Sequence, residues 1–375
     1  MTRALCFALL WSALSNAHLV AASKGSLDQA RFVGATGCKS SSCHGGAGEK
    51  HGQYFTWAQR DFHTRGFAIL TTARSARIAE ALGLKDATSS SRCTVCHSPF
   101  QALAPQRLAA AVDPRESVSC ENCHGAPGPW LRGHTRTDWT YATRIGAGMR
   151  DLKSFYVRAN TCVACHQNLD TDLSAAGHPD LLFEMDRQSV AEPKHWTDPE
   201  GSGPRAWLVG QAVALREASW KLARQPTGNE QTLAQYHGLA WLLAKISALD
   251  SSMARIDPPS NGNAADFAHT QQQADALARH ATRQNLDPAF VRRLLSSLAG
   301  TAEEFSPSSA TPREVLFPRA QRLVLALAAL DADKRNFGQH TDKLLRDVRS
   351  LAEFDPVEFG AHLATLRDAP SVGDG

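Results

Sequence analysis

Eight of the nine cysteines in this 375-residue chain fall into four pairs, and a histidine directly follows each pair. The pairs and their histidines are Cys38/Cys43 with His44, Cys93/Cys96 with His97, Cys120/Cys123 with His124, and Cys162/Cys165 with His166. Two residues separate the cysteines in the last three pairs, and four separate Cys38 from Cys43. This pattern constrains the chain more than any other feature, because it indicates a disulfide framework, zinc sites or covalent haem attachment.

The trailing histidines favour haem attachment. Two thiols about one helical turn apart can add to both haem vinyl groups while the adjacent histidine reaches the iron. Zinc sites would not need a histidine after every pair, a redox dithiol occurs once and near a βαβ pattern, and disulfides leave the histidines unexplained. We therefore predict four covalently attached haem c groups, with His44, His97, His124 and His166 as the proximal iron ligands. In the first motif, the flexible stretch of serine and glycine around Cys43 can loop out the two additional residues.

The sixth iron ligands decide what such a protein can do. A second imidazole closes the iron and favours electron transfer, whereas an open position allows small molecules to bind. The distal candidates in this region are His63, His134, His178, His195 and His51. We expect the first three to be ligands, His195 to be the next candidate, and His51 to be an ordinary surface residue. The histidines after residue 204 have no partners at ligand spacing and are expected at surface or packing positions; they are His237, His269, His280, His340 and His362.

The N-terminus has the features of an export signal. Arg3 precedes an apolar run from residue 4 to residue 14, and small residues follow, with Ala17 and Ala22 as cleavage points. We predict a signal peptide over residues 1–22, which contains the remaining cysteine, Cys6, and a periplasmic mature protein. That run is too short to span a membrane, and no later stretch of about 18 residues is uninterruptedly apolar. The mature chain is therefore not expected to be membrane-spanning.

The charge of the chain changes once haem is counted. The formal charge at pH 7 is +3, but each haem adds two propionates, so four haems would add roughly eight negative charges. The resulting mildly acidic protein argues against a nucleic-acid partner and suits a redox partner protein with a basic docking patch.

The residue composition and the spacing of apolar residues change near residue 200. Before it, the chain is rich in Gly, Pro, Ser, Trp and His, and haem is expected to supply the core of a domain over residues 23–200 that has little regular structure and stacked haems. After it, apolar residues recur at helical spacing. We predict helices there over 205–224, 230–253, 264–283, 288–299, 312–332, 340–353 and 356–366. The predicted fold is thus mainly α, with a tetrahaem cytochrome c domain followed by an α-helical domain over residues 201–375 without haem motifs.

From about residue 37 to residue 196 the chain resembles the multihaem cytochromes related to cytochrome c-554. The resemblance rests on four features: the Cys38 to His44 motif with its two following glycines; Trp57 followed by Asp61-Phe-His63-Thr-Arg-Gly-Phe; Cys120-Glu-Asn-Cys123-His124-Gly; and Ala-Ala-Gly-His178-Pro with Phe183-Glu184. It implies closely stacked haems, mostly two histidines per iron, periplasmic electron transfer, and distal roles for His63, His134 and His178. Some relatives leave one haem five-coordinate. The haem at His97 is the candidate here, and His195 is the residue expected to close it.

Longer relatives carry a further haem motif in the region that here reads Ala234 to Trp241, where this chain has no cysteine. The alignment implies that a haem has been lost there and that the segment packs as an apolar helix.

Three functions remain open at this point. The first is a periplasmic tetrahaem cytochrome that transfers electrons between redox partners and catalyses no bond chemistry. The second is a multihaem oxidoreductase acting on a small nitrogen or sulfur compound at one open iron. The third is a haem subunit of a larger, membrane-associated respiratory complex, with the helical half as the docking arm.

Overall fold

The computed structural model describes residues 30–49, 51–167, 169–185, 194–225, 227–258, 262–331 and 338–368. The predicted signal peptide and Cys6 lie outside these ranges. The described chain is mainly helical; within it there is no β-strand, only an isolated bridge between Phe32 and Leu108. The prediction of a mainly α fold is confirmed. No helix in the described ranges has both the length and the apolar character needed to cross a membrane.

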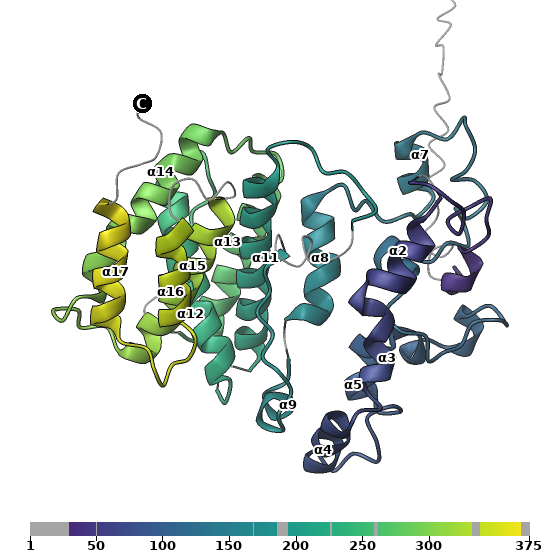
Figure 1. Ribbon diagram of the computed structural model, residues 1–375, viewed down its shortest axis with the longest axis horizontal. Helices are drawn as coiled ribbons and strands as arrows, with labels where there is room; N and C mark the ends of the chain where they lie inside the picture. The colour runs from purple at the N-terminus through teal and green to yellow at the C-terminus, as the bar shows by residue number, and fades with distance from the viewer. Residues whose placement is uncertain are drawn as a thin grey trace, which may run out of the picture.

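The N-terminal half consists of short helices joined by loops (right side of Figure 1). Its α-helices are α2 (Gln53–Arg60), α3 (Gly66–Ile69), α4 (Ala73–Ala81), α5 (Ser91–His97), α6 (Cys120–His124), α7 (Tyr141–Gly146), α8 (Phe155–His166) and α9 (Thr171–Ala175). Single 3-10 turns add η1 (Ala35–Gly37), η2 (Phe62–Arg65), η3 (Pro99–Ala102) and η4 (Pro105–Arg107). Most of these helices are too short to be stable in isolation, so tertiary contacts must hold them.

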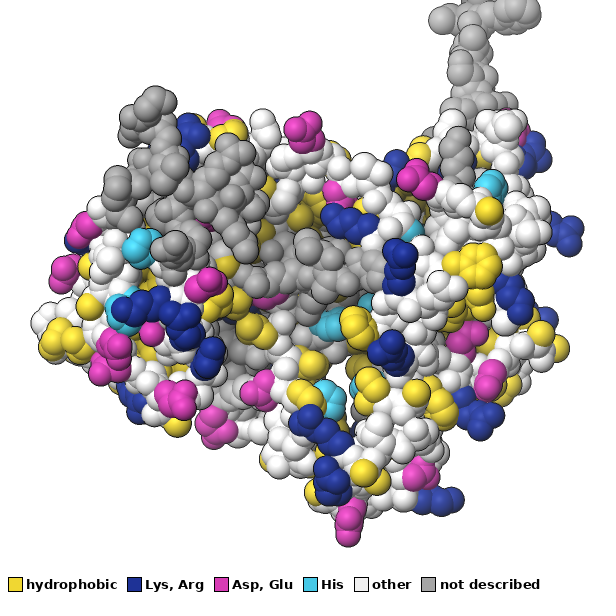
Figure 2. All heavy atoms as spheres, viewed as in Figure 1, with side chains coloured by type: hydrophobic (Ala, Val, Ile, Leu, Met, Phe, Trp, Pro, Cys, Tyr) yellow, Lys and Arg dark blue, Asp and Glu magenta, His cyan; other side chains and the backbone are white. Residues whose placement is uncertain are grey.

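Aliphatic packing in this half is sparse. One cluster consists of only three buried residues, Leu70, Ala79 and Ala87. Large apolar side chains reach the surface instead, among them Phe62, which is 69% exposed, and Val95, which is 51% exposed; Figure 2 shows apolar side chains at the surface on this side of the molecule. An arrangement with so little apolar burial of its own suits a domain whose core is completed by large apolar cofactors.

The C-terminal half is a bundle of long helices (left side of Figure 1). They are α11 (Gly203–Arg224), α12 (Glu230–Ala248), α13 (Ala264–Ala281), α14 (Pro288–Ala299), α15 (Arg313–Leu330), α16 (Gly338–Asp347) and α17 (Pro356–Asp368), with the 3-10 turn η5 (Gly300–Phe305) after α14. All seven predicted ranges contain a helix. The largest difference is at α16, which ends six residues before the predicted end at residue 353. Helix α12 ends five residues early because Asp250 accepts a hydrogen bond from the Ser252 amide and starts a turn.

The bundle is held by one extensive apolar core and by close helix crossings. Gly238 of α12 lies against the carbonyl oxygen of Pro318 in α15, where an added Cβ would be only 2.5 Å from that oxygen. A glycine therefore lets the two helices approach each other closely. The segment expected to be an apolar helix in place of a lost haem motif lies within α12, which bears out the helical part of that expectation.

Helix α8 joins the two halves. It lies between the bundle and the small helices in Figure 1, and its residues Phe155, Ala159 and Val163 belong to the same core cluster as the bundle helices. The four-residue spacing places these three side chains on one face. The helix that carries the fourth cysteine motif therefore packs as part of the bundle, although it precedes the predicted domain boundary at residue 200.

A buried ion pair fastens a second segment of the N-terminal half to the bundle. Arg322 of α15 contacts Glu184 with its Nη1 at 2.6 Å from Oε1, and the two side chains are 2% and 5% exposed. Gln211 of α11 bridges the pair: its amide nitrogen donates to Glu184 and its oxygen accepts from Arg322. Arg322 also donates to the carbonyl oxygen of Phe183. The chain just after His178 is thereby fixed to α11 and α15.

Candidate haem sites

Three of the four cysteine motifs end a helix. His97, His124 and His166 are the last residues of α5, α6 and α8, and the two cysteines before each histidine are one helical turn apart. The first motif is different: residues 38–44 form turns, with the Cys43 amide donating to Ser40 and the His44 amide donating to Cys38. The two additional residues of this motif are therefore accommodated in a turn, as the sequence suggested.

Each of the four proximal histidines faces one of the distal candidates. The ring centroids are 6.1 Å apart for His44 and His134, 6.0 Å for His63 and His166, 6.3 Å for His97 and His178, and 6.2 Å for His124 and His195. The partners in these pairs are 71 to 103 residues apart in the chain by their numbering. The structure thus brings together all eight histidines that the sequence singled out as iron ligands.

This separation is the one that a shared metal requires. A bond from a metal to an imidazole nitrogen is about 2 Å long and the ring centre lies roughly 1.2 Å further, so opposite ligands have centroids about 6.3 Å apart. A direct hydrogen bond between two rings, with its nitrogen atoms about 2.9 Å apart, would bring the centroids closer, to about 5.3 Å. The donor set, four pairs of imidazoles beside four pairs of cysteines, fits four haem c groups.

Hydrogen bonds at Nδ1 orient most of these rings. His97 Nδ1 lies 3.2 Å from the carbonyl oxygen of Gly66, His134 Nδ1 lies 2.6 Å from that of Leu131, and His178 Nδ1 lies 2.8 Å from that of Pro179. A carbonyl oxygen only accepts, so Nδ1 must carry the hydrogen in these three rings. The other nitrogen, Nε2, is then left as the metal ligand, the usual arrangement in which an outer partner fixes the tautomer.

Side-chain acceptors orient two more rings. His44 Nδ1 lies 3.0 Å from Gln53 Oε1, and His63 Nδ1 lies 2.9 Å from Asp61 Oδ1. Burial acts to raise the pKa of Asp61, but the hydrogen bonds from His63 outweigh it, and the pKa of this carboxyl lies below its usual range. Asp61 is therefore a carboxylate that accepts from the ring. Gln53 and Asp61 were not identified from the sequence as site residues; their nearness to the ligands, at offsets of nine and two residues, was the available signal.

Burial favours the neutral form of His97, His124 and His166. It lowers the pKa of His97 and of His166, and it lowers the pKa of His124 to about 4. A neutral imidazole is the form that binds a metal. These rings are thus in the ligand form at pH 7.

Thiols from different motifs meet inside the N-terminal half. Cys38 and Cys120 are within hydrogen-bonding reach of each other, as are Cys96 and Cys165. In each contact one thiol has its pKa raised, Cys120 in the first and Cys96 in the second, chiefly by the hydrogen bond to the other. These four cysteines are thiols and are not joined in disulfides. The attachment points of the first and third motifs, and those of the second and fourth, are therefore adjacent.

A buried carboxyl group, Glu121, and a half-buried one, Glu116, join the segment before the first motif to the third motif. Glu121, between Cys120 and Cys123, accepts hydrogen bonds from the amides of Val33 and Gly34 at 2.8 and 2.6 Å, and Glu116 accepts from the amide of Ala35 at 2.9 Å. Glu121 is 2% exposed, and burial raises its pKa to about 7. These hydrogen bonds were not predicted from the sequence, since only the tertiary fold brings residues 33–35 next to α6.

Arg150 caps the end of α6. Its Nη1 donates to the carbonyl oxygens of Asn122 and Cys123 at 2.6 and 3.0 Å, and its amide donates to that of His124. A cation at the C-terminus of a helix satisfies the last carbonyls and opposes the helix dipole. Arg150 therefore fixes the position of the third motif.

Two tryptophans pack against distal rings. Trp130 makes an edge contact with His134, and Trp196 makes one with His195. The indole N–H of Trp130 is buried and has no acceptor among the described residues. Because a buried donor without an acceptor is costly, this N–H suits a cofactor with a polar periphery, such as the propionates of haem.

The expectation for one histidine, His195, differs from the structure. His195 was expected to close the iron at His97, but it faces His124, and His97 faces His178. Sequence distance suggested the wrong assignment, since it cannot tell which loop returns to which helix. His51 is exposed, as expected of a surface residue, and its Nδ1 donates to the carbonyl oxygen of Cys43 at 2.6 Å.

The histidines of the bundle have other neighbours. His362 lies 2.7 Å from Asp347, His269 lies 3.1 Å from Gln273, and His237 is half-buried in α12. His280 has Gln284 as its partner. No group of three or more His, Cys, Asp or Glu side chains within the described ranges is arranged to hold a lone metal ion.

Comparison with known proteins agrees with the site. A family model described as cytochrome c554 and c-prime matches residues 37–125, which include the first three motifs and His63. No curated protein and no solved structure gives a significant match. The matching segment, the attachment motifs and the paired histidines lead to one conclusion: the chain is a c-type cytochrome that takes part in electron transfer and is related to the cytochrome c554 family.

Proposed function

We propose that this protein is a periplasmic tetrahaem cytochrome that carries electrons between redox partner proteins, with all four irons closed by two histidines. The observation that carries the proposal is the common separation of 6.0 to 6.3 Å in four histidine pairs. When bound, each haem supplies an iron that changes between the ferric and ferrous states. The proximal ligands are His44, His97, His124 and His166, and the distal ligands are His134, His178, His195 and His63 in the same order.

The surroundings of the ligands support a relay. Fixed Nδ1 partners at His44, His63 and His97 keep the rings in place, so the ligand geometry changes little between oxidation states. The contacts between Cys38 and Cys120 and between Cys96 and Cys165 place attachment points of different haems next to each other. Short spacing between carriers is what rapid electron transfer needs.

The alternative of an oxidoreductase requires an iron with an open position. The expected open site was the haem at His97, but the imidazole of His178 is 6.3 Å from that ring. Nothing in the described residues favours the alternative over the carrier. Membership of a larger respiratory complex, with the helical bundle as the docking arm, is compatible with the carrier function and would define the redox partner.

Low-temperature EPR of the ferric protein, together with a haem count, tests the proposal. We expect four haems and an entirely low-spin spectrum. His178→Ala should convert one haem in four to a high-spin form that binds carbon monoxide when reduced, because its imidazole faces His97. His51→Ala is the matched control and should leave all four haems low-spin, because His51 donates to a backbone carbonyl.

A high-spin haem in the wild-type protein that binds carbon monoxide or nitric oxide would overturn the closed-carrier proposal and favour the oxidoreductase. A count of three haems, unchanged in a Cys38→Ala Cys43→Ala variant, would remove the first site. Export is tested separately, by locating the protein in periplasmic extracts and reading the N-terminal residue of the mature chain.

A further inference from the structure

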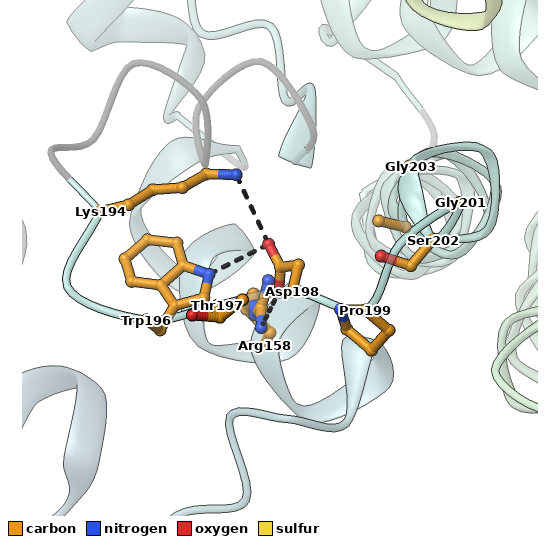
Figure 3. A pocket seen from close by; sticks show the side chains of 10 residues that line it. Arg158, Lys194, Trp196, Thr197, Asp198, Pro199, Gly201, Ser202 and Gly203 are labelled. Atoms are coloured by element: carbon orange, nitrogen blue, oxygen red, sulfur yellow. Dashed lines mark hydrogen bonds and ion pairs between the residues drawn. The ribbon is translucent and has the colours of Figure 1, made fainter.

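A cavity of about 400 Å³ lies beside the third haem site. It is open to solvent on one side and is lined by α8, by the segment from Lys194 to Pro199, and by the first residues of α11 (Figure 3). His195 is in that segment, and its ring packs edge-on against Trp196 at 5.2 Å between ring centroids. Because Trp196 also lines the cavity, the cavity adjoins the distal side of the pair formed by His124 and His195.

The cavity has more positive than negative charge. Arg158 and Lys194 line it, and Asp198 is the one carboxylate among its described lining residues. Asp198 accepts from Arg158 Nη2 at 2.9 Å, and Lys194 Nζ is 3.7 Å from it. A third cation is close by, since the guanidinium groups of Arg158 and Arg205 both lie over the ring of Phe155, at 5.1 and 5.2 Å.

Asp198 binds only some of the hydrogen-bond donors of Arg158 and Lys194. Burial acts to raise its pKa, but hydrogen bonds from Arg158 and Trp196 lower it below the usual range, so Asp198 is charged. Arg158 Nε donates to the carbonyl oxygen of Leu152 and Nη2 donates to Asp198, while Nη1 has no hydrogen-bond partner among the described residues. Glu200 is exposed and does not line the cavity. One carboxylate therefore faces two cations that retain free donors.

The first turn of α11 adds to this positive field. The N-terminus of a 22-residue helix carries a partial positive charge and free backbone N–H groups. Ser202 is the N-cap residue, yet its hydroxyl makes no capping hydrogen bond and has no partner in the described structure, although the residue is only 7% exposed. Figure 3 shows Ser202 on the wall opposite Lys194 and Trp196. Next to it, an added Cβ on Gly203 would have no atom within 4 Å, so the space in front of the helix is open.

We propose that this cavity binds a carboxylate or another small oxyanion, which is held by Arg158, Lys194 and the hydroxyl of Ser202 at the N-terminus of α11. An oxyanion would satisfy the buried Ser202 hydroxyl and the free Nη1 donor together, with charge-assisted hydrogen bonds. Two sources offer this chemistry. One is a propionate of the haem held by His124 and His195, and this source rests on the proposed function. The other is a free oxyanion from solution.

The test uses the full-length haem-loaded protein and three variants. Lys194→Gln and Ser202→Ala each remove one donor from the cavity without touching a histidine ligand. Lys85→Gln is the matched control, because Lys85 is exposed in the same half of the protein and is remote in sequence from the cavity. Inorganic phosphate is the probe for a free oxyanion, and its binding is followed by phosphorus NMR. The reduction potential of each haem and the propionate bands in resonance Raman spectra report on the propionate.

If a propionate fills the cavity, Lys194→Gln should lower the reduction potential of one haem, since a positive charge is lost beside it, and both cavity variants should shift one propionate band. Phosphate should then have no effect. If a free oxyanion fills it, the wild type should bind one phosphate saturably, and each cavity variant should weaken binding about tenfold. Lys85→Gln should do neither.

The inference is overturned if the wild type binds no phosphate and both cavity variants match Lys85→Gln in potentials and propionate bands. The same samples keep this result separate from the proposed function. Four low-spin haems without either response refute the oxyanion site alone. Fewer than four haems with saturable phosphate binding refute the tetrahaem proposal and support the site.

Discussion

The buried pair of Arg322 and Glu184 gives the sharpest stability prediction. Replacing Arg322 by methionine removes the contact at 2.6 Å and leaves the carboxylate of Glu184, 5% exposed, without its guanidinium partner, although the amide of Gln211 still donates to it. Breaking a buried ion pair by removing one partner costs about 3–5 kcal/mol, mainly because a charge is left buried without compensation. We expect the free energy of unfolding of Arg322→Met to fall by that amount.

The control is the same substitution at an equally short but exposed pair. Arg136 contacts Asp138 at 2.6 Å, but these side chains are 61% and 62% exposed, so Arg136→Met should cost about 0–1 kcal/mol. Urea unfolding followed by far-UV circular dichroism measures both. Adding Glu184→Gln to Arg322→Met should recover part of the lost free energy of unfolding, because the double variant no longer buries the negative charge of Glu184 without a positive partner. A loss below about 1 kcal/mol in Arg322→Met, or a double variant that loses the sum of both single changes, would refute the reasoning.

Three further predictions concern the haem half. Burial raises the pKa of Glu121 from 4.5 to about 7, so the stability linked to its proton is present below pH 4.5 and is lost, by about 3 kcal/mol, as the pH rises through 7. Urea midpoints should show this loss in the wild type and not in Glu121→Gln. Equal dependence of the two midpoints on pH would argue against it. The ring planes of His44 and His134 are 19° apart, whereas those of the other pairs differ by 58° to 84°. Near-parallel imidazoles split the iron d orbitals most, so EPR should show one rhombic low-spin signal that His134→Ala removes. Four strongly anisotropic signals would contradict the geometry. A Cβ on Gly66 would lie 2.6 Å from the His97 carbonyl oxygen, so Gly66→Ala should destabilise the protein by about 1–3 kcal/mol in the same unfolding assay; an unchanged midpoint would show that α3 and α5 separate freely.

Much of the helical half could be predicted from periodicity and turn residues. The predicted helix over 288–299 matches α14 at both ends, because Asp287 caps it and Pro288 suits its first turn. The 3-10 turn η5 directly after it was not predicted, since Gly300 normally marks the end of a helix and nothing in the sequence requires the chain to continue in a tighter turn.

The haem ligands were predictable as a set but not as pairs. Attachment chemistry is local, so the cysteine spacing identified His97 and its counterparts directly. Pairing depends on the path of the whole chain: His63 meets His166, 103 residues later, and no local signal encodes that. The hydrogen bonds to Glu121 were unpredictable for the same reason. A glutamate between the two cysteines of such a motif is expected to be exposed, and only the fold places the amides of residues 33 and 34 next to it.

The position of α8 has a consequence for how the protein matures. Its Phe155 face is packed in the bundle core, and Cys162 packs partly against that core. The first three cysteine motifs lie in chain that can be modified as soon as it emerges. The fourth lies on a helix whose neighbours, α11 and α13, begin 37 and 98 residues after it ends. We therefore expect haem attachment at Cys162 and Cys165 to precede docking of the bundle, so that the bundle helices pack onto a chain that already holds its cofactors.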